Sequence, residues 1–463
     1  MKFDLTSGQD SLLREAADFV TCDDADILVV NGYAGTGKTT VMAAVVEALR
    51  GMEIPCVLLA PTGRAAKVLS SYTHMSAYTV HKCIYRRKST DDAGFGQFSL
   101  APNKARDTLF IVDEVSLMGI GSADGRQTAV FGSGDLLADL VEFVRNGRDC
   151  RMILVGDSAQ LPPVGLEESP ALSRDYMSQM GGVRFSVLTE VVRQQKESGI
   201  LHNATRLREI ISSGNGEIRR DALGLSLKPF DDVERIGGEE LAECIADAYG
   251  KYGEDETIVL CRSNKRAIRY NAGIRAQVQY REERLVRGDR LMIVKNCYQF
   301  VGDVKEMDYI ANGDMAVLAG ISRFEERYGL HFAQATLAFP DYGGLELGAK
   351  VLLDTLDSES ASLDYGQSER LYRGVSEDYA HLSAKKRYEA VREDPYYNAL
   401  QLKYANAIPC HKSQGGQWQC VFIDNPFWQE TLGTDDLKWL YTAFTRAVQK
   451  VFLVNFDDEL FID

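Results

Sequence analysis

The residues from Asn31 to Thr40, NGYAGTGKTT, have the types and spacing of a loop that binds phosphate groups. They match G-x-x-x-x-G-K-[ST] at every fixed position, namely Gly32, Gly37, Lys38 and Thr39. Glycines let backbone N–H groups surround a phosphate, the lysine reaches the β and γ oxygens, and the threonine hydroxyl binds Mg²⁺. A glycine-rich turn without a ligand is the alternative, and the complete match argues against it. We therefore predict a site for a magnesium nucleotide.

This loop needs a strand before it and a helix after it. Residues 27–30 form a short apolar run, typical of a strand buried on both faces, and residues 39–49 carry apolar side chains at helical spacing. Further apolar runs at 56–60, 108–112 and 152–155 also end in polar residues. Because the carboxyl ends of parallel strands meet at one edge of a sheet, these polar ends should share a crevice with Lys38. The pattern predicts an α/β fold with a parallel sheet.

Two acidic residues and two glutamines are candidates for chemistry in that crevice. Asp113 would hold Mg²⁺, directly or through water, and Glu114 would orient or deprotonate the attacking water. Gln160 could bond both the γ-phosphate and a nucleic-acid strand, and the amide of Gln9 matches the donor and acceptor of adenine. A helix cap is the alternative for the acidic pair, and a solvent-facing side chain is the alternative for each glutamine.

Length, charge and cysteine content restrict the class of protein. A chain of 463 residues is long enough for two to four domains, and its net charge of −15 argues against coating a duplex but permits a groove for one strand. No apolar run of 18 residues occurs, and the start lacks the features of a signal peptide, so we expect a soluble cytoplasmic protein without membrane contact. The nine cysteines form no C-x-x-C pair, and we expect most of them to be packing residues.

A second α/β pattern begins near Glu190 and has no phosphate loop. It contains Arg193 and Arg446, and arginines from a second unit stabilise charge on a γ-phosphate that the first unit binds. Either arginine alone would be an ordinary surface residue. Residues 285–404 interrupt this pattern: their first part alternates like the short strands of a small β-barrel, and residues 357–394 are charged and partly helical. The sequence leaves open whether that later part is an arm or a solvated excursion.

A polar insertion between Tyr85 and Asp107 separates two predicted strands of the first unit. Its centre, residues 94–98, has the pattern of a small hairpin that exposes or half-buries Phe95 and Phe98. An aromatic side chain on a projecting hairpin could act as a wedge against a base pair. A simple loop with a small local cluster is the alternative.

Nine motifs, in order, resemble those of the superfamily 1 helicases of the 5′-to-3′ group, the RecD-like and phage Dda-like enzymes. They are LTSGQ (5–9), GYAGTGKTT (32–40), LLAPTGRAAKVL (58–69), TVHK (79–82), FIVDEVSLM (110–118), LVGDSAQLPPVG (154–165), LTEVVRQ (188–194), HKSQG (411–415) and YTAFTRA (441–447). The phosphate loop is shared by many NTPases, whereas APTGRAAK, HKSQG and YTAFTRA are far more specific. Pro409 and Ala159 depart from the usual pattern, and Pro409 puts one contact with the strand in doubt.

The resemblance implies two tandem RecA-like domains, a hairpin in the first, and an SH3-like barrel with a helical arm in the second. The implied boundaries are 1–84 and 108–189 for the first domain, 85–107 for the hairpin, 190–284 and 405–463 for the second domain, and 285–404 for the insertion.

The same resemblance assigns roles to particular residues. Those implied to hold ATP are Gln9, Gly32, Gly35, Thr36, Gly37, Lys38, Thr39, Thr40 and Gly415, with Thr39 and Asp113 as Mg²⁺ ligands. Those implied in catalysis are Lys38, Glu114, Gln160, Arg193 and Arg446. The implied path of the strand contains Thr62, His81, His411 and Ser413, with Phe98 as the candidate wedge.

The implied activity is that of an ATP-dependent helicase or translocase. It would move 5′-to-3′ on single-stranded DNA as a monomer and open junctions of single and double strands in repair, recombination or replication, where protein partners are expected. The alternative is a DNA-stimulated ATPase subunit of a recombination complex without unwinding of its own. A RecD-like exonuclease is disfavoured, because we find no cluster of carboxylates and lysine outside the motor motifs.

Overall fold

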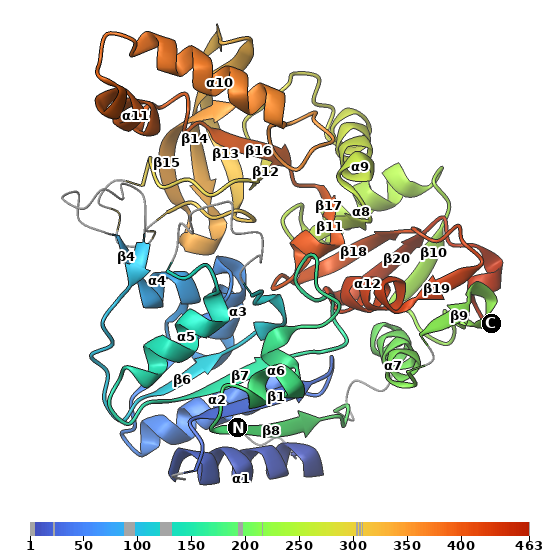
Figure 1. Ribbon diagram of the computed structural model, residues 1–463. Coiled ribbons are helices and arrows are strands. Elements are labelled where there is room, and N and C mark those ends of the chain that lie inside the picture. The colour runs from blue at the N-terminus through green and yellow to red at the C-terminus, as the bar shows by residue number, and fades with distance from the viewer. Residues whose placement is uncertain are drawn as a thin grey trace.

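The computed structural model describes residues 5–21, 24–87, 98–120, 132–192, 198–214, 216–301, 304, 307 and 309–462. Figure 1 shows two α/β units side by side, with a β-barrel above them that carries two helices on its outer side. No helix in the described ranges is long and apolar enough to cross a membrane. The three bodies meet at the middle of the molecule, where the candidate sites lie.

The first unit is built around a parallel sheet of order β3-β2-β6-β7-β1-β8. Its strands are β1 (Ile27–Gly32), β2 (Cys56–Ala60), β3 (Ala77–Thr79), β6 (Leu109–Val112), β7 (Arg151–Gly156) and β8 (Val183–Leu188). Its helices are α1 (Ser7–Thr21), α2 (Lys38–Gly51), α3 (Gly63–Thr73), α4 (Val80–Ile84), α5 (Leu136–Arg145) and α6 (Arg174–Ser178). Along β1, Leu28 and Val30 face the core under α1 and α2, whereas Ile27 and Val29 face the core under α5. Burial on both faces explains the continuous apolar runs in the sequence.

A short antiparallel pair leaves the first unit between α4 and β6. It consists of β4 (Tyr85–Arg87) and β5 (Phe98–Leu100), with Tyr85 opposite Leu100. The predicted centre of the hairpin lies mostly within residues 88–97, which are outside the described residues. The structure therefore shows the base of a hairpin at the predicted position.

The second unit has a parallel sheet of order β10-β20-β18-β11-β17. Its strands are β10 (Val233–Ile236), β11 (Thr257–Cys261), β17 (Ala407–Pro409), β18 (Trp418–Asp424) and β20 (Ala447–Val454). Helices α7 (Gly199–Ser212) and α12 (Thr434–Phe444) pack on one face, and α8 (Leu241–Tyr252) and α9 (Asn264–Gln277) pack on the other. A small pair, β9 (Glu217–Arg219) and β19 (Thr431–Gly433), lies beside α12. The predicted fold class, two tandem parallel α/β units, is confirmed.

The insertion forms a closed barrel of β12 (Arg290–Ile293), β13 (Met315–Arg327), β14 (Leu330–Phe339), β15 (Leu345–Leu352) and β16 (Leu400–Tyr404). The charged segment after it forms α10 (Tyr365–Asp378) and α11 (Ala384–Glu393). These helices pack on the barrel: Leu371, Val375 and Val391 share an apolar cluster with Leu330 and Phe332. The segment that the sequence left undecided is therefore an ordered arm, because one apolar face of each helix covers the outer side of β14.

Candidate nucleotide cleft and strand groove

The predicted phosphate loop connects β1 to α2 and is shaped by close contacts at its glycines. Gly37 has φ +77° at the start of α2, and a Cβ there would come within 2.5 Å of the Gln9 amide nitrogen. A Cβ on Gly32 would lie 2.6 Å from the Cγ of Lys38. Glycine is required at both positions, because a side chain would displace Gln9 or the catalytic candidate Lys38.

Lys38 contacts groups of its own unit. Its ammonium donates to the Tyr33 carbonyl at 3.1 Å and lies 3.8 Å from the Oδ2 of Asp157, a carboxylate at the end of β7. Burial raises the pKa of Asp157, and the nearby charge of Lys38 opposes that rise. The lysine is thus held beside the loop by an acidic partner.

Asp113 and Glu114 follow β6 at the same edge of the sheet. Asp113 is buried, and its Oδ1 accepts a hydrogen bond from the Glu114 backbone N–H at 2.9 Å. Burial and the neighbouring Glu114 raise the pKa of Asp113 well above its usual range. A divalent cation would reverse that effect by stabilising the carboxylate. The oxygen donors of Asp113 and Thr39 fit Mg²⁺, which prefers carboxylate and hydroxyl ligands.

A cavity of about 400 Å³ separates these groups from the second unit. The predicted site residues that line it are Gly35, Gly37, Lys38, Thr39, Thr40, Asp113, Glu114, Gln160, Gly415 and Arg446. The structure therefore brings together residues up to 411 positions apart, Gly35 and Arg446, in one cleft between the units. Arg193, the other predicted arginine, lies outside the described residues.

On the side of the second unit, Arg446 lines the cleft. Its side chain is buried and donates to the carbonyls of Thr442 and Gly416, each at 3.2 Å. These contacts hold the guanidinium at the cleft in a fixed orientation. On the opposite side, the Oε1 of Gln160 is buried and has no hydrogen-bond partner among the described residues. An orphaned acceptor in this cleft is a group that a bound ligand or its water can satisfy.

Gln9 lies behind the phosphate loop. Its amide nitrogen donates to the Thr36 carbonyl at 2.9 Å, and its Oε1 accepts from the Thr6 backbone N–H at 3.1 Å. The side chain is buried, so the alternative of a solvent-facing glutamine is wrong. Both ends of the amide support the loop, and the adenine contact stays a prediction. Thr36 is fully buried and, like Gly32 and Gln9, shapes the loop from behind the cavity.

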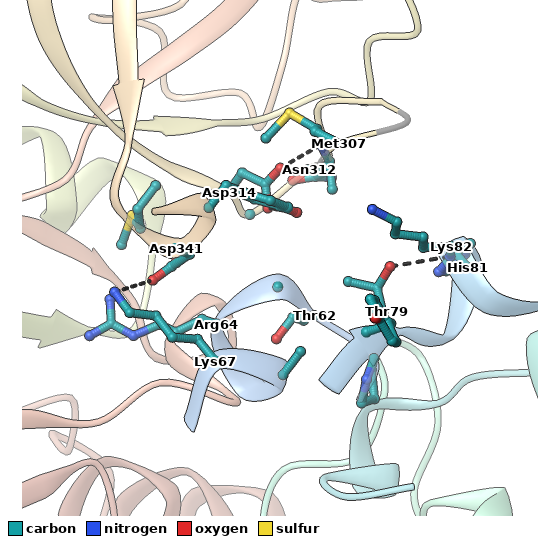
Figure 2. Close-up of a pocket in the computed structure, with 18 of the residues that line it drawn as sticks. Thr62, Arg64, Lys67, Thr79, His81, Lys82, Met307, Asn312, Asp314 and Asp341 are labelled. Atoms are coloured by element: carbon teal, nitrogen blue, oxygen red, sulfur yellow. Dashed lines mark hydrogen bonds and ion pairs between the residues drawn. The ribbon is translucent and has the colours of Figure 1, made fainter. Parts of the chain in front are cut away.

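The boundary between the two α/β units, called the seam below, also holds a larger groove of about 670 Å³, and the barrel contributes to the lining of this groove. It contains four residues predicted on the strand path, Thr62, His81, His411 and Ser413. Figure 2 shows Thr62, Arg64 and Lys67 on one side, with Met307, Asn312 and Asp314 of the insertion across from them. Lys67 reaches across the groove to Asp341 at 3.6 Å.

The two histidines of the groove are neutral at pH 7. Burial lowers the pKa of His81 to about 4, and burial with the adjacent Lys412 lowers the pKa of His411 to about 4. The Ser413 hydroxyl is buried and donates to the Cys410 carbonyl at 2.6 Å. The Thr62 hydroxyl accepts from the Ala65 N–H at 3.2 Å and caps α3. These four residues shape the groove, and its positive charge comes from other side chains.

Comparison with known proteins finds two family models that match parts of this chain. A family model described as an AAA domain matches residues 4–213, and one described as a UvrD-like helicase C-terminal domain matches residues 404–454. The ATP-dependent RecD2 DNA helicase of Deinococcus radiodurans is 36% identical over 138 residues, which are 30% of this chain and 16% of that protein. In these stretches the chain is similar to superfamily 1B helicases.

Two further DNA helicases match longer stretches at lower identity. The ATP-dependent DNA helicase dda of Enterobacteria phage T4 is 29% identical over 195 residues, 41% of this chain and 40% of dda. The Psychrobacter helicase Pif1 is 23% identical over 429 residues, 85% of this chain and 61% of that protein. The chain thus spans less than two thirds of each of these relatives. A solved structure of Bacteroides Pif1 with ADP-AlF3 and ssDNA aligns over 100% of this chain and 95% of that one, with 16% identity and a TM-score of 0.49.

The cations of the groove are residues that the sequence analysis did not single out. They are Arg64, Lys67, Lys82 and Lys412. Lys412 donates to the Asn312 side chain at 3.0 Å, and Arg64 stacks on the ring of Trp418 at 4.0 Å. All four lie inside motifs already quoted, GRAAK, TVHK and HKSQG. A search for basic residues within those motifs would have found them.

Phe98 does not project from the hairpin as the wedge interpretation requires. Its side chain is only 8% exposed, and its ring centroid lies 5.3 Å from that of Tyr298 and 6.4 Å from that of Tyr309. Both tyrosines belong to the insertion, so the aromatic contact joins the hairpin to the barrel. The sequence could not show this, because Tyr298 is 200 positions from Phe98 along the chain.

Proposed function

We propose that this protein is an ATP-driven motor that moves 5′-to-3′ on single-stranded DNA and separates duplex DNA ahead of it. The observation that carries this proposal is the course of one short segment, residues 411–415. His411, Lys412 and Ser413 line the groove, and Gly415, two residues later, lines the nucleotide cleft. A shift of this segment on nucleotide binding would therefore change both sites together.

The residues that would act in ATP hydrolysis come from both units. The first unit would hold the phosphates of ATP with its loop and Lys38, and Glu114 would orient the attacking water. Mg²⁺ held by Thr39 and Asp113 would neutralise charge on the phosphates. Arg446 of the second unit would stabilise charge that develops on the γ-phosphate. Hydrolysis would then require the units to close, and loss of the γ-phosphate would let them open.

The groove residues fit a single strand. Lysine and arginine side chains contact phosphates, while the aromatic rings of Tyr78, Tyr309 and Tyr342 line the same groove and offer faces on which bases can stack. This local arrangement answers the objection raised by the net charge of −15, because the described lining of the groove has four cations against two carboxylates, Asp314 and Asp341. RecD2 and dda, named as ATP-dependent DNA helicases, support the choice of DNA.

The biological process and the cellular location are part of the same proposal. Junctions of single and double strands arise in DNA repair, recombination and replication, and we place a monomeric cytoplasmic motor in one of these processes, where partner proteins would deliver it to the junction.

A forked-duplex assay tests the proposal. Duplexes with only a 5′ tail, only a 3′ tail, or both are incubated with ATP and Mg²⁺, alongside ATPase measurements with and without single-stranded DNA or RNA. We expect unwinding from the 5′ tail alone and ATP hydrolysis that depends on single-stranded DNA. Full turnover without nucleic acid would overturn the motor. Stimulated hydrolysis without strand separation would instead identify a DNA-stimulated ATPase subunit.

A further inference from the structure

The side chain of Tyr441 connects the second unit to the phosphate loop of the first. It extends from α12, is 1% exposed, and begins the YTAFTRA motif that ends near Arg446. Its hydroxyl accepts a hydrogen bond from the Ala34 backbone N–H at 2.8 Å and donates one to the Oδ2 of Asp157 at 2.7 Å. One buried hydroxyl thus satisfies a donor of the phosphate loop and an acceptor at the end of β7.

Asp157 links this contact to the catalytic lysine. The same Oδ2 atom that accepts from Tyr441 lies 3.8 Å from the ammonium of Lys38. Two further hydrogen bonds join the units at Leu161. The Thr442 hydroxyl accepts from the Leu161 N–H at 2.8 Å, and the Gln414 side-chain amide donates to the Leu161 carbonyl at 2.6 Å. The contact at Tyr441 is therefore part of an ordered seam.

The position of Tyr441 also fixes Arg446 relative to the loop. Arg446 donates to the carbonyl of Thr442, the residue after Tyr441, so both side chains are attached to the same end of α12. Ala34 precedes Gly35 and Gly37, which line the cleft next to Lys38. Ala34 lines the same cavity, so Tyr441 holds a part of the loop that borders the nucleotide cleft.

We propose that Tyr441 is a positioning residue that sets the distance between the phosphate loop and Arg446. The inference deepens the proposed function, since it rests on ATP hydrolysis in the cleft. A hydroxyl suits the role because it donates and accepts at once, and no apolar ring can hold Ala34 and Asp157 together. Removing it leaves the Ala34 N–H unpaired, takes one hydrogen bond from the buried Asp157 carboxylate, and lets the two halves of the cleft separate.

Tyr441→Phe keeps the ring and removes the hydroxyl, and Tyr249→Phe is a matched control. The Tyr249 hydroxyl donates to the Asn406 side chain at 3.4 Å within the second unit, and Tyr249 does not line the cleft. We expect Tyr441→Phe to lower kcat for ATP in the presence of single-stranded DNA by roughly 10- to 100-fold, as small misplacements of catalytic groups do. KM for ATP should change less than about threefold, because the phosphate contacts lie within the first unit. The control should match the wild type.

Hydrogen exchange gives a readout that does not depend on catalysis. The Ala34 amide, followed by mass spectrometry of peptides that span residues 27–40, should exchange slowly in the wild type with and without ADP. It should exchange faster in Tyr441→Phe and remain slow in Tyr249→Phe. The wild-type measurement also decides the case if Tyr441→Phe does not fold, because fast exchange without nucleotide would contradict the contact.

The outcomes separate this inference from the proposed function. An unchanged kcat and unchanged exchange in Tyr441→Phe would overturn the positioning role while the motor stands. A rise in KM that matches the loss of kcat/KM, with kcat unchanged, would also overturn it, because that is a binding role. If the wild type hydrolyses no ATP, the proposed function fails, and exchange at Ala34 alone decides whether Tyr441 holds the loop.

Discussion

The nucleotide cleft and the strand groove lie on one seam but are built in opposite ways. In the cleft the charged and polar groups are fixed: Lys38, Asp157, Tyr441 and Arg446 each have buried hydrogen-bonded or ionic partners. In the groove the charge comes from long lysines such as Lys67, which is 55% exposed. Chemistry on a γ-phosphate needs fixed geometry, whereas a strand that must slide needs contacts that break easily. Substitutions should therefore have large, specific effects in the cleft and small, additive, salt-dependent effects in the groove.

The largest effect is expected for Lys38→Ala. Its ammonium is the cation that the loop offers to the β and γ oxygens, and its loss should reduce ATP hydrolysis to background, about a thousandfold or more. Affinity for a fluorescent oligonucleotide, measured by anisotropy without nucleotide, should stay within about threefold of the wild type, because Lys38 does not line the groove. A comparable loss of strand affinity would break the distinction between the two sites.

Arg446→Lys should have the next largest effect. Lysine keeps the charge but loses the planar fork that donates to Gly416 and Thr442, so it cannot be held in the same orientation. We expect kcat to fall by roughly a hundredfold or more with little change in KM, since arginines of this kind contribute about 10³ to 10⁵ to the rate. A rise in KM with unchanged kcat would show that Arg446 binds ATP without acting on the γ-phosphate.

Lys67→Ala and Lys412→Ala test the expected small, additive effects in the groove. Each should weaken binding of single-stranded DNA by several-fold and reduce the salt dependence of log K by about 0.7 if it contacts one phosphate. The effects of the two variants should add, because Lys67 contacts Asp341 whereas Lys412 contacts Asn312, and these two contacts share no partner. An unchanged slope of log K against log salt in both variants would exclude the strand from this groove.

The pH dependence of stability provides a smaller effect from the same region. His81 and His411 have pKa values lowered to about 4 by burial, below the 6.5 of an unfolded histidine. The unfolded chain therefore binds more protons between pH 4 and 6.5, so these two residues contribute stability above that window that is lost as the pH falls through it. The thermal midpoint of His81→Asn/His411→Asn should fall less steeply from pH 6.5 to 5 than that of the wild type. Equal slopes would show that the two imidazoles are solvated.

The sequence predicted the cleft better than the groove for a physical reason. Phosphate binding restricts backbone conformation locally, so Gly37, Lys38 and Thr39 must be adjacent in the chain, and Asp113 and Glu114 must end a buried strand. The cleft also needs Arg446, which the second α/β pattern offered as one of two candidate arginines and which the resemblance to a family assigned to catalysis. The groove has no such local requirement, because long cations can reach a strand from many positions, and its wall at Asn312 and Asp341 comes from the barrel.

Residues that act across the seam were the hardest to predict. Tyr441 was part of a quoted motif, but its partner Ala34 is 407 positions away, and no periodicity in either segment indicates the contact. The arm formed by α10 and α11 was uncertain for a similar reason: its helices are strongly charged, and their apolar faces become visible only when the barrel surface that they cover is known.

The smallest effect on strand separation is expected for Phe98→Leu, which tests whether the hairpin acts through this ring. Phe98 packs against Tyr298 and Tyr309, so a leucine retains much of the apolar contact between the hairpin and the barrel. If the ring only joins these two bodies, the number of base pairs opened per ATP should remain within about twofold of the wild type, with a modest loss of thermal stability. A wedge, in contrast, must meet the first base pair with an aromatic face, and leucine has none. Loss of unwinding with normal DNA-stimulated ATPase activity would therefore mean that Phe98 leaves its tyrosine partners when a fork is bound.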